Sequence, residues 1–148
     1  MNIRSLPKVS LHDHLDGGLR PETIIDLAKQ IGHKLPTNDP KELRQWFLDS
    51  CNSGSLVTYL ETFVHTTAVM QTKEGLIRVA REFALDLAND GVIYGEIRWA
   101  PEQHLSQGLT LDQVVECVET GLAEAREEVK AKGGYLQTGQ LKIGRAHV

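Results

Sequence analysis

Strand-like segments separated by helical stretches constrain the fold of this chain more than any other feature. Residues 92–99 are rich in β-branched and aromatic side chains, and residues 8–14 form a shorter apolar run, so both are predicted to be strands. Elsewhere apolar residues recur at helical spacing, which predicts helices over residues 21–31, 41–48, 56–67, 73–87 and 111–129. A further strand is expected within 135–143. Strands that alternate with helices predict a parallel α/β sheet, either open or closed into a barrel.

Capping residues support these boundaries. Ser55 and Thr72 are each expected to cap the helix that follows, and Thr110 with Gln113 forms a capping-box pattern. Gly32 and Gly91 are expected to end helices, because glycine readily adopts the left-handed conformation that terminates a helix.

Composition and charge argue against several classes of protein. The chain has 148 residues, enough for one domain with a real core, and no interdomain linker is visible. Its formal net charge of -4 argues against binding to nucleic acid or to an anionic membrane. No apolar stretch approaches the roughly 20 residues of a membrane span, and residues 1–8 lack the apolar run of a signal peptide. We therefore expect a soluble, cytoplasmic protein.

Two histidines, His12 and His14, lie at the end of the first predicted strand. Alternate side chains of a strand point to the same face, so the two α-carbons would lie about 6.6 Å apart with both rings on one side. Imidazole is a common ligand of zinc and similar ions. Asp13 would point to the opposite face, away from such an ion. Two ligands do not complete a site, so this pattern alone leaves open a metal site and a pair of surface histidines.

Two segments resemble the adenosine deaminase family. Residues 8–17, KVSLHDHLDG, are similar to its N-terminal signature, and residues 94–101, YGEIRWAP, are similar to its YxExRxxP segment. Residues 59–63, YLETF, fit their place between the two. The resemblance covers about residues 5–141 and is closest to bacterial members. It implies a (β/α)₈ TIM barrel of the metal-dependent hydrolase type, which binds one zinc ion and hydrolyses adenosine or deoxyadenosine to the inosine product and ammonia.

The resemblance also implies roles for individual residues. His12 and His14 would be zinc ligands, and His14 would lie beside the nucleoside. Asp16 would contact the ribose 5′-hydroxyl, while Tyr59 and Phe63 would line the apolar edge of the pocket. Zinc lowers the pKa of bound water to near neutrality, which would supply a hydroxide for attack on the purine C6. Glu96 and Arg98 are expected to be structural.

Half of such an enzyme has no counterpart in this sequence. A (β/α)₈ barrel typically needs about 250 residues, and this chain supplies roughly two and a half strand–helix units. The third histidine ligand, the aspartate ligand, the general-acid glutamate and the second catalytic histidine of the family are all expected beyond residue 148. Because catalytic zinc needs three protein ligands and water, the resemblance predicts no catalytic residue in this chain and no deaminase activity for the chain alone.

The last seven residues have a different expected origin. Residues 1–141 are similar to the family, whereas residues 142–148, KIGRAHV, match a translation of a common sequencing-adapter string. We therefore expect this heptapeptide to be a non-native tail, and His147 is not counted as a metal ligand.

Two alternatives remain open at this point. The chain could belong to a related HxH metal hydrolase, such as an adenine or AMP deaminase. Asp16 favours a nucleoside with a free 5′-hydroxyl, because a carboxylate would repel a 5′-phosphate. The chain could also be a non-catalytic truncated fragment with weak zinc affinity, prone to association through its open strand edges.

The other histidines and both cysteines are expected to have no catalytic or ligand role. His33 lies in a polar loop and should be solvated, while His65 lies within a helix beside its apolar stripe. His104 follows a strand and is expected at the surface or at the strand end. Cys51 and Cys117 show no metal or disulfide spacing and are expected to be ordinary thiols.

Overall fold

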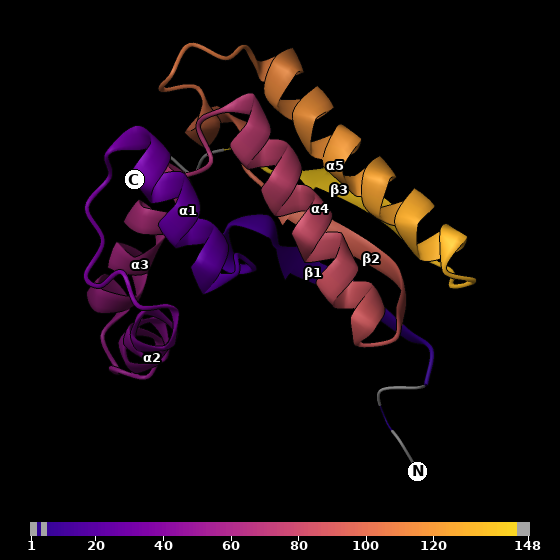
Figure 1. Ribbon diagram of the computed structural model, residues 1–148, viewed down its shortest axis with the longest axis horizontal. Coiled ribbons are helices and arrows are strands. Elements are labelled where there is room, and N and C mark those ends of the chain that lie inside the picture. The colour runs from indigo at the N-terminus through magenta and orange to yellow at the C-terminus, as the bar shows by residue number, and fades with distance from the viewer. Residues whose placement is uncertain (1–2, 4–5, 145–148) are drawn as a thin grey trace.

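The computed structural model describes residue 3 and residues 6–144, and it confirms the alternation of strands and helices (Figure 1). The elements, in chain order, are β1 (Lys8–His14), the 3₁₀ turn η2 (Leu15–Gly17), α1 (Pro21–Ile31), α2 (Pro40–Cys51), α3 (Leu56–Ala68), α4 (Lys73–Asn89), β2 (Val92–Trp99), the 3₁₀ turn η3 (Pro101–His104), α5 (Leu111–Ala131) and β3 (Gln137–Lys142). Every predicted helix is present with boundaries shifted by at most a few residues. Within the described part of the chain, each helix is too short or too polar to cross a lipid bilayer.

The three strands form one parallel sheet in the order β1-β2-β3. His14 on β1 lies opposite Arg98 on β2, which in turn lies opposite Leu141 on β3. Because all three strands run in the same direction, their carboxyl ends lie along one edge of the sheet. Helices α4 and α5 pack side by side against one face, and α1, α2 and α3 gather beside the end of β1 (Figure 1).

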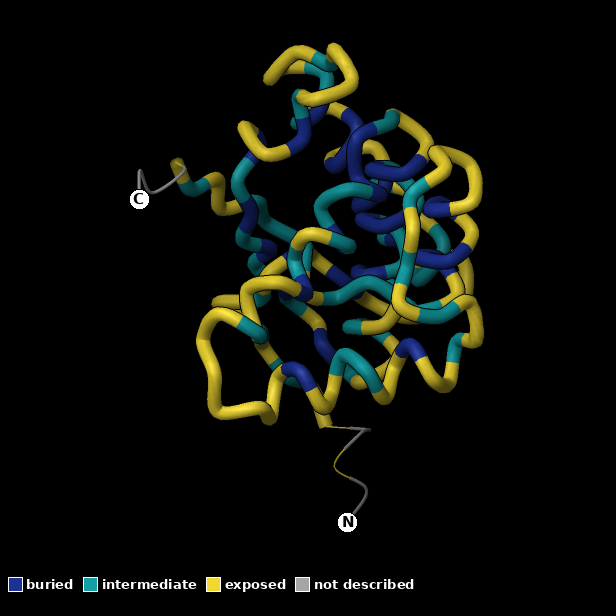
Figure 2. Tube along the Cα trace, turned by 90° about the vertical axis from the view of Figure 1, so that its left-hand side faces the viewer, coloured by how far each residue is buried: buried dark blue, intermediate teal, exposed yellow. Residues whose placement is uncertain are grey.

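The core cluster joins the sheet to α4 and α5 and extends to α1 through Ile24 and Leu27. Figure 2 shows the buried segments of the chain in dark blue. From β2, Ile97 and Trp99 are almost fully buried, and they belong to the same cluster as Leu76 of α4 and Leu122 of α5. The other face of β1 is open, since Val9 keeps 57% of its surface exposed to solvent. Helices therefore cover one face of the sheet, while the other face is exposed at β1, as expected for part of a barrel.

Helix capping follows the predicted pattern. The side chain of Ser55 accepts a hydrogen bond from the Thr58 amide, and Thr110 and Gln113 form the complete capping box. Asp39, which the sequence reading did not single out, caps α2 by accepting hydrogen bonds from two amides. This cap starts α2 at Pro40, one residue before the predicted helix.

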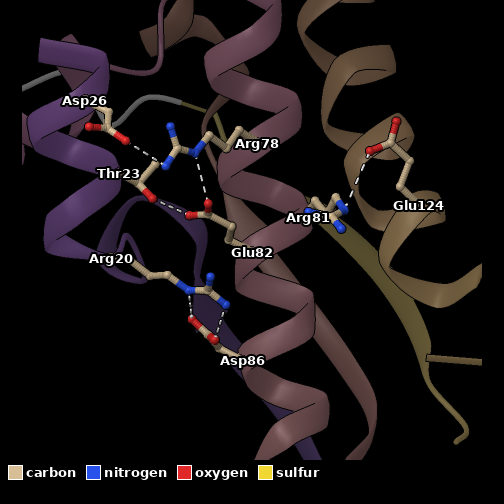
Figure 3. Close-up of polar contacts among 8 residues, drawn as sticks. All are labelled: Arg20, Thr23, Asp26, Arg78, Arg81, Glu82, Asp86 and Glu124. Atoms are coloured by element: carbon tan, nitrogen blue, oxygen red, sulfur yellow. Dashed lines mark hydrogen bonds and ion pairs between the residues drawn. The ribbon is translucent and has the colours of Figure 1, made fainter. Parts of the chain in front are cut away.

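Ion pairs between charged side chains connect α1 to α4 (Figure 3). Arg20, at the start of α1, donates two hydrogen bonds to the carboxylate of Asp86, at 2.9 and 2.6 Å. Arg78 on α4 donates to Glu82 on the same helix at 2.9 Å and to Asp26 on α1 at 3.1 Å. These contacts fix the start of α1, and therefore the turn η2 that connects it to β1.

The end of the described chain continues the sheet. Lys142 is the last residue of β3, and the Ile143 amide donates a hydrogen bond to the Trp99 carbonyl at 2.9 Å. Residues 145–148 of the expected tail lie outside the described residues. The origin of residues 142–148 stays a prediction.

Candidate functional site

The end of β1 presents both predicted metal ligands on one side. The ring centroids of His12 and His14 lie 5.2 Å apart with an interplanar angle of 43°, and both residues are exposed. The strand ends here because Leu15 is fully buried and Asp16-Gly17 folds into the turn η2. Within residues 6–144, no group of three or more histidine, cysteine, aspartate or glutamate side chains is arranged to hold a metal ion. These two imidazoles thus form at most half of a coordination shell.

Arg98, on the neighbouring strand β2, lies beside His12 of this pair. Its Nη1 atom lies 3.2 Å from Nδ1 of His12, while its Nε atom is buried without a hydrogen-bond partner. Strand alternation puts Glu96 on the same face of β2 as Arg98. The YxExRxxP-like segment therefore contributes side chains next to the histidine pair, in addition to its place in the sheet.

Asp16 is positioned by η2 between the histidines and the helical cluster. Its side chain keeps 17% of its surface exposed, and its Oδ1 atom is buried without a hydrogen-bond partner. Burial raises the pKa of the Asp16 carboxyl above its ordinary value, although its backbone hydrogen bond and the nearby His14 oppose this shift. The Asp16 Oδ1 atom lies 3.9 Å from Nδ1 of His14, too far for a hydrogen bond, so this oxygen can accept one from a ligand.

A cavity of about 360 Å³ opens beside Asp16. Tyr59 and Phe63 of α3 line it together, with ring centroids 5.3 Å apart in an edge-to-face arrangement. The structure thus brings together three of the four predicted substrate-binding residues. His14, the residue that precedes η2, is not among the residues that line the cavity.

Helix α2 contributes a wall of the cavity that the sequence reading missed. Arg44, Leu48 and Cys51 all line it, and their spacing of four and three residues places them on one helical face. That periodicity was visible in the sequence. Phe47, which precedes Leu48 in the chain, lines the cavity as well.

The structure differs in part from two expectations: His104 follows the end of β2 and His33 lies in the loop after α1, as expected, but neither is a solvated surface residue. His104 is not at the surface: it is 1% exposed, and its Nδ1 lies 3.1 Å from the Met70 carbonyl oxygen. Burial lowers the pKa of His104 to about 4, against the opposing effect of its hydrogen bond to Met70. His33 is not simply solvated, since its Nε2 lies 2.9 Å from Nδ1 of His65. Trp46 packs edge-on against the His65 ring, so these side chains join the loop after α1 to α2 and α3.

The two cysteines form no disulfide within the described residues. Cys51 is exposed and Cys117 is buried, and both thiols are free.

Comparison with known proteins places the chain in a family. A profile described as adenosine deaminase matches residues 7–138. Adenosine deaminase 1 of Streptomyces coelicolor is 53% identical over 146 residues, which cover 98% of this chain and 37% of that protein. The chain spans about two fifths of the length of the curated relatives it matches.

Solved structures agree with this assignment at the level of the fold. The N6-mAMP deaminase of Arabidopsis matches with a TM-score of 0.73 and 27% identity, over 95% of this chain and 41% of that one. A zinc-bound amidohydrolase from Burkholderia ambifaria matches with a TM-score of 0.75 and 21% identity, over 95% of this chain and 36% of that one. The predicted fold class is confirmed, because the three-stranded sheet corresponds to an incomplete (β/α)₈ barrel. The chain belongs to the adenosine deaminase family.

Proposed function

We propose that this chain is the N-terminal portion of a zinc-dependent hydrolase that converts adenosine, and deoxyadenosine, to the inosine product and ammonia. The observation that carries the proposal is the buried Oδ1 of Asp16, which has no hydrogen-bond partner among the described residues and belongs to a residue between the histidine pair of β1 and the apolar cavity. The 53% identity to an adenosine deaminase supports the same reaction. We also propose a small-molecule nucleoside partner and a cytoplasmic location.

His12 and His14 fit a zinc ion as two of its ligands. They provide two imidazole nitrogen donors, from one strand end and on one side of it, and both residues are exposed to solvent. When bound, the ion supplies a water of near-neutral pKa as the nucleophile for the purine C6. The role of this chain is to hold the two imidazoles at the carboxyl end of β1, which is the end where barrel enzymes place their reacting groups.

Asp16 would bind the ribose. Its free Oδ1 accepts a hydrogen bond from the 5′-hydroxyl of a nucleoside, which satisfies an atom that is otherwise buried without a partner. A 5′-phosphate in the same place would bring two negative charges together in a partly buried site. This argument favours a nucleoside over AMP as the substrate.

Tyr59 and Phe63 would cover the apolar edge of the bound nucleoside. Their edge-to-face contact holds both rings against the cavity opposite η2, and their apolar surface keeps water away from that side.

Two experiments test this proposal. In the first, the purified chain is incubated with zinc and adenosine, and ammonia release is measured. We expect no turnover, since the chain offers two metal ligands and no general acid; measurable turnover would show that the proposed incompleteness is wrong.

The second experiment uses the DNA downstream of the codon for Leu141. We expect it to encode further strand–helix units with a late histidine, glutamate and aspartate, and to lack the adapter-derived codons of residues 142–148. The longer protein should convert adenosine faster than AMP or adenine. A preference for AMP or adenine would instead favour one of the related deaminases.

A further inference from the structure

Two histidines outside the proposed metal site meet where α2, α3 and the loop after α1 come together. His33 in that loop and His65 on α3 lie 2.9 Å apart, measured from Nε2 to Nδ1, and their ring centroids are separated by 5.2 Å. Both residues are half-buried. The ring of Trp46 on α2 packs edge-on against His65, with a centroid distance of 5.3 Å. The histidine pair therefore joins α3 to the loop after α1, and Trp46 connects α2 to the same contact.

The same contact lies next to the cavity beside Asp16. Thr66, the residue after His65, lines that cavity together with three other residues of α3. On α2, Phe47 lines the cavity, and its ring packs edge-on against Trp46 with a centroid distance of 5.1 Å. The histidine pair and Trp46 therefore help to fix the α3 wall of the cavity against its α2 wall.

The contact between the two histidines depends on how many protons their rings carry. When both rings are neutral, an N–H of one ring donates and the facing nitrogen of the other accepts. One added proton is tolerated, because the charged ring donates to the neutral one. With a second added proton neither facing nitrogen can accept, and two positive charges repel each other across 2.9 Å. The hydrogen bond is then lost.

The charged groups on the surrounding elements do not pair with these two rings. These groups are Lys29 of α1, Lys34 and Asp39 in the loop, Glu42 and Asp49 of α2, and Glu61 of α3. Among residues 6–144, no ion pair joins a carboxylate to His33 or His65. Burial lowers the pKa of the His65 imidazole below its ordinary value, and the facing His33 lowers it further. His65 therefore gains a proton more readily when the contact is open than when it is closed.

We propose that His33 and His65 form a pH-sensitive latch that holds α3 in place as a wall of the cavity, and that protonation of both rings releases this wall. The latch is complete above the ordinary histidine pKa of about 6.5 and is lost as the pH falls below it, because the open form then binds a proton that the closed form excludes. The proposal rests on the proposed function only in taking the cavity as the nucleoside site, and it adds a control of that site by pH.

Hydrogen exchange of backbone amides tests the latch without a ligand. Protection of α3 and α5 is measured in the unchanged chain at about pH 7.5 and about pH 5.5, on either side of the histidine pKa, and is corrected for intrinsic exchange. Helix α5 contains no histidine and contacts α4, so it reports any loss of stability of the whole chain, including the loss caused by His104. A ring with an ordinary pKa of about 6.5 that must be neutral in the closed form weakens closing about tenfold by about pH 5.5. Protection of α3 should therefore fall about tenfold more than protection of α5.

Three variants separate the histidine pair from other causes of this extra fall. His65→Gln can still form a hydrogen bond with His33 but gains no proton, so α3 and α5 should lose protection equally. His33→Gln should reduce the extra fall, because His65 no longer faces a second charge. Lys34→Gln is the matched control: it removes an exposed positive charge next to His33 in the chain and should keep the whole extra fall.

Three results would each overturn the latch: equal losses of protection in α3 and α5 of the unchanged chain, an extra fall that persists in His65→Gln, or one that is undiminished in His33→Gln. The proposed function fails by a different measurement. If the longer protein does not deaminate adenosine, the assignment of the cavity to a nucleoside is wrong, while the response of α3 to pH stands.

Discussion

Gly121 of α5 lies directly against the carbonyl oxygen of Ile77 on α4. A β-carbon added at position 121 would lie 2.3 Å from that oxygen and 2.9 Å from the β-carbon of Ala80. A backbone carbonyl cannot move aside as the end of a flexible side chain can. The two helices can therefore approach this closely only because residue 121 has no side chain. This contact sets the distance between the two helices that cover the sheet.

Gly121→Ala should therefore destabilise the chain. Alanine favours a helix by about 1 kcal/mol over glycine, but forcing a methyl group into this contact costs about 1–3 kcal/mol or more. We expect a net loss of stability, measured as a lower midpoint in urea unfolding. Gly17→Ala is the matched control, because the nearest atom to its added β-carbon is 3.9 Å away. A midpoint for Gly121→Ala at or above that of the unchanged chain would contradict the packing described above.

Stability should fall between pH 6.5 and pH 4 because of His104. Its pKa is lowered to about 4 in the folded chain by burial, against about 6.5 when unfolded. The unfolded chain thus binds a proton first as the pH falls, so the contribution of neutral His104 is complete above pH 6.5 and is lost toward pH 4. The loss amounts to about 3 kcal/mol.

His104→Gln should flatten this pH dependence in denaturant unfolding measured at several pH values. The unchanged chain, measured at the same pH values, gives the reference slope. An equally steep slope in His104→Gln would show that other groups cause the loss at low pH.

Asp16→Asn should stabilise the chain at neutral pH, and its amide oxygen can still accept the proposed hydrogen bond from the ribose. Burial raises the pKa of Asp16, so folding favours the protonated acid, and ionisation weakens the fold as the pH rises. An uncharged amide avoids that cost, and we expect a gain of about 1 kcal/mol at pH 7 that disappears near pH 3. Thermal unfolding at both pH values measures it. The matched change Glu102→Gln, at an exposed carboxylate, should give no comparable gain.

The fold was largely predictable because its signals are local. The β-branched run of β2 and the capping box of Thr110 and Gln113 depend on neighbours within a few residues, and both appear as expected. The burial of His104 could not be predicted from its neighbours in the sequence. It depends on Met70, 34 residues earlier in the chain, and on the ring of Trp99, with a centroid 5.7 Å away.

In the candidate site, too, local features could be predicted from the sequence, whereas contacts between distant residues could not. The facing rings of His12 and His14 follow from strand alternation alone. The meeting of Asp16 with α2 and α3 does not, because it needs the packing of three helices around η2. The contact between Arg98 and His12 joins residues 86 positions apart, and only the register of β1 against β2 brings them together.

The central claim is that His12 and His14 are two ligands of one zinc ion. The most direct test is anomalous diffraction at the zinc edge, on crystals of the longest protein that the gene encodes, grown with zinc. We predict one strong peak about 2.0–2.1 Å from an imidazole nitrogen of both residues. A bound zinc ion held without nitrogen atoms from these two positions would contradict the account.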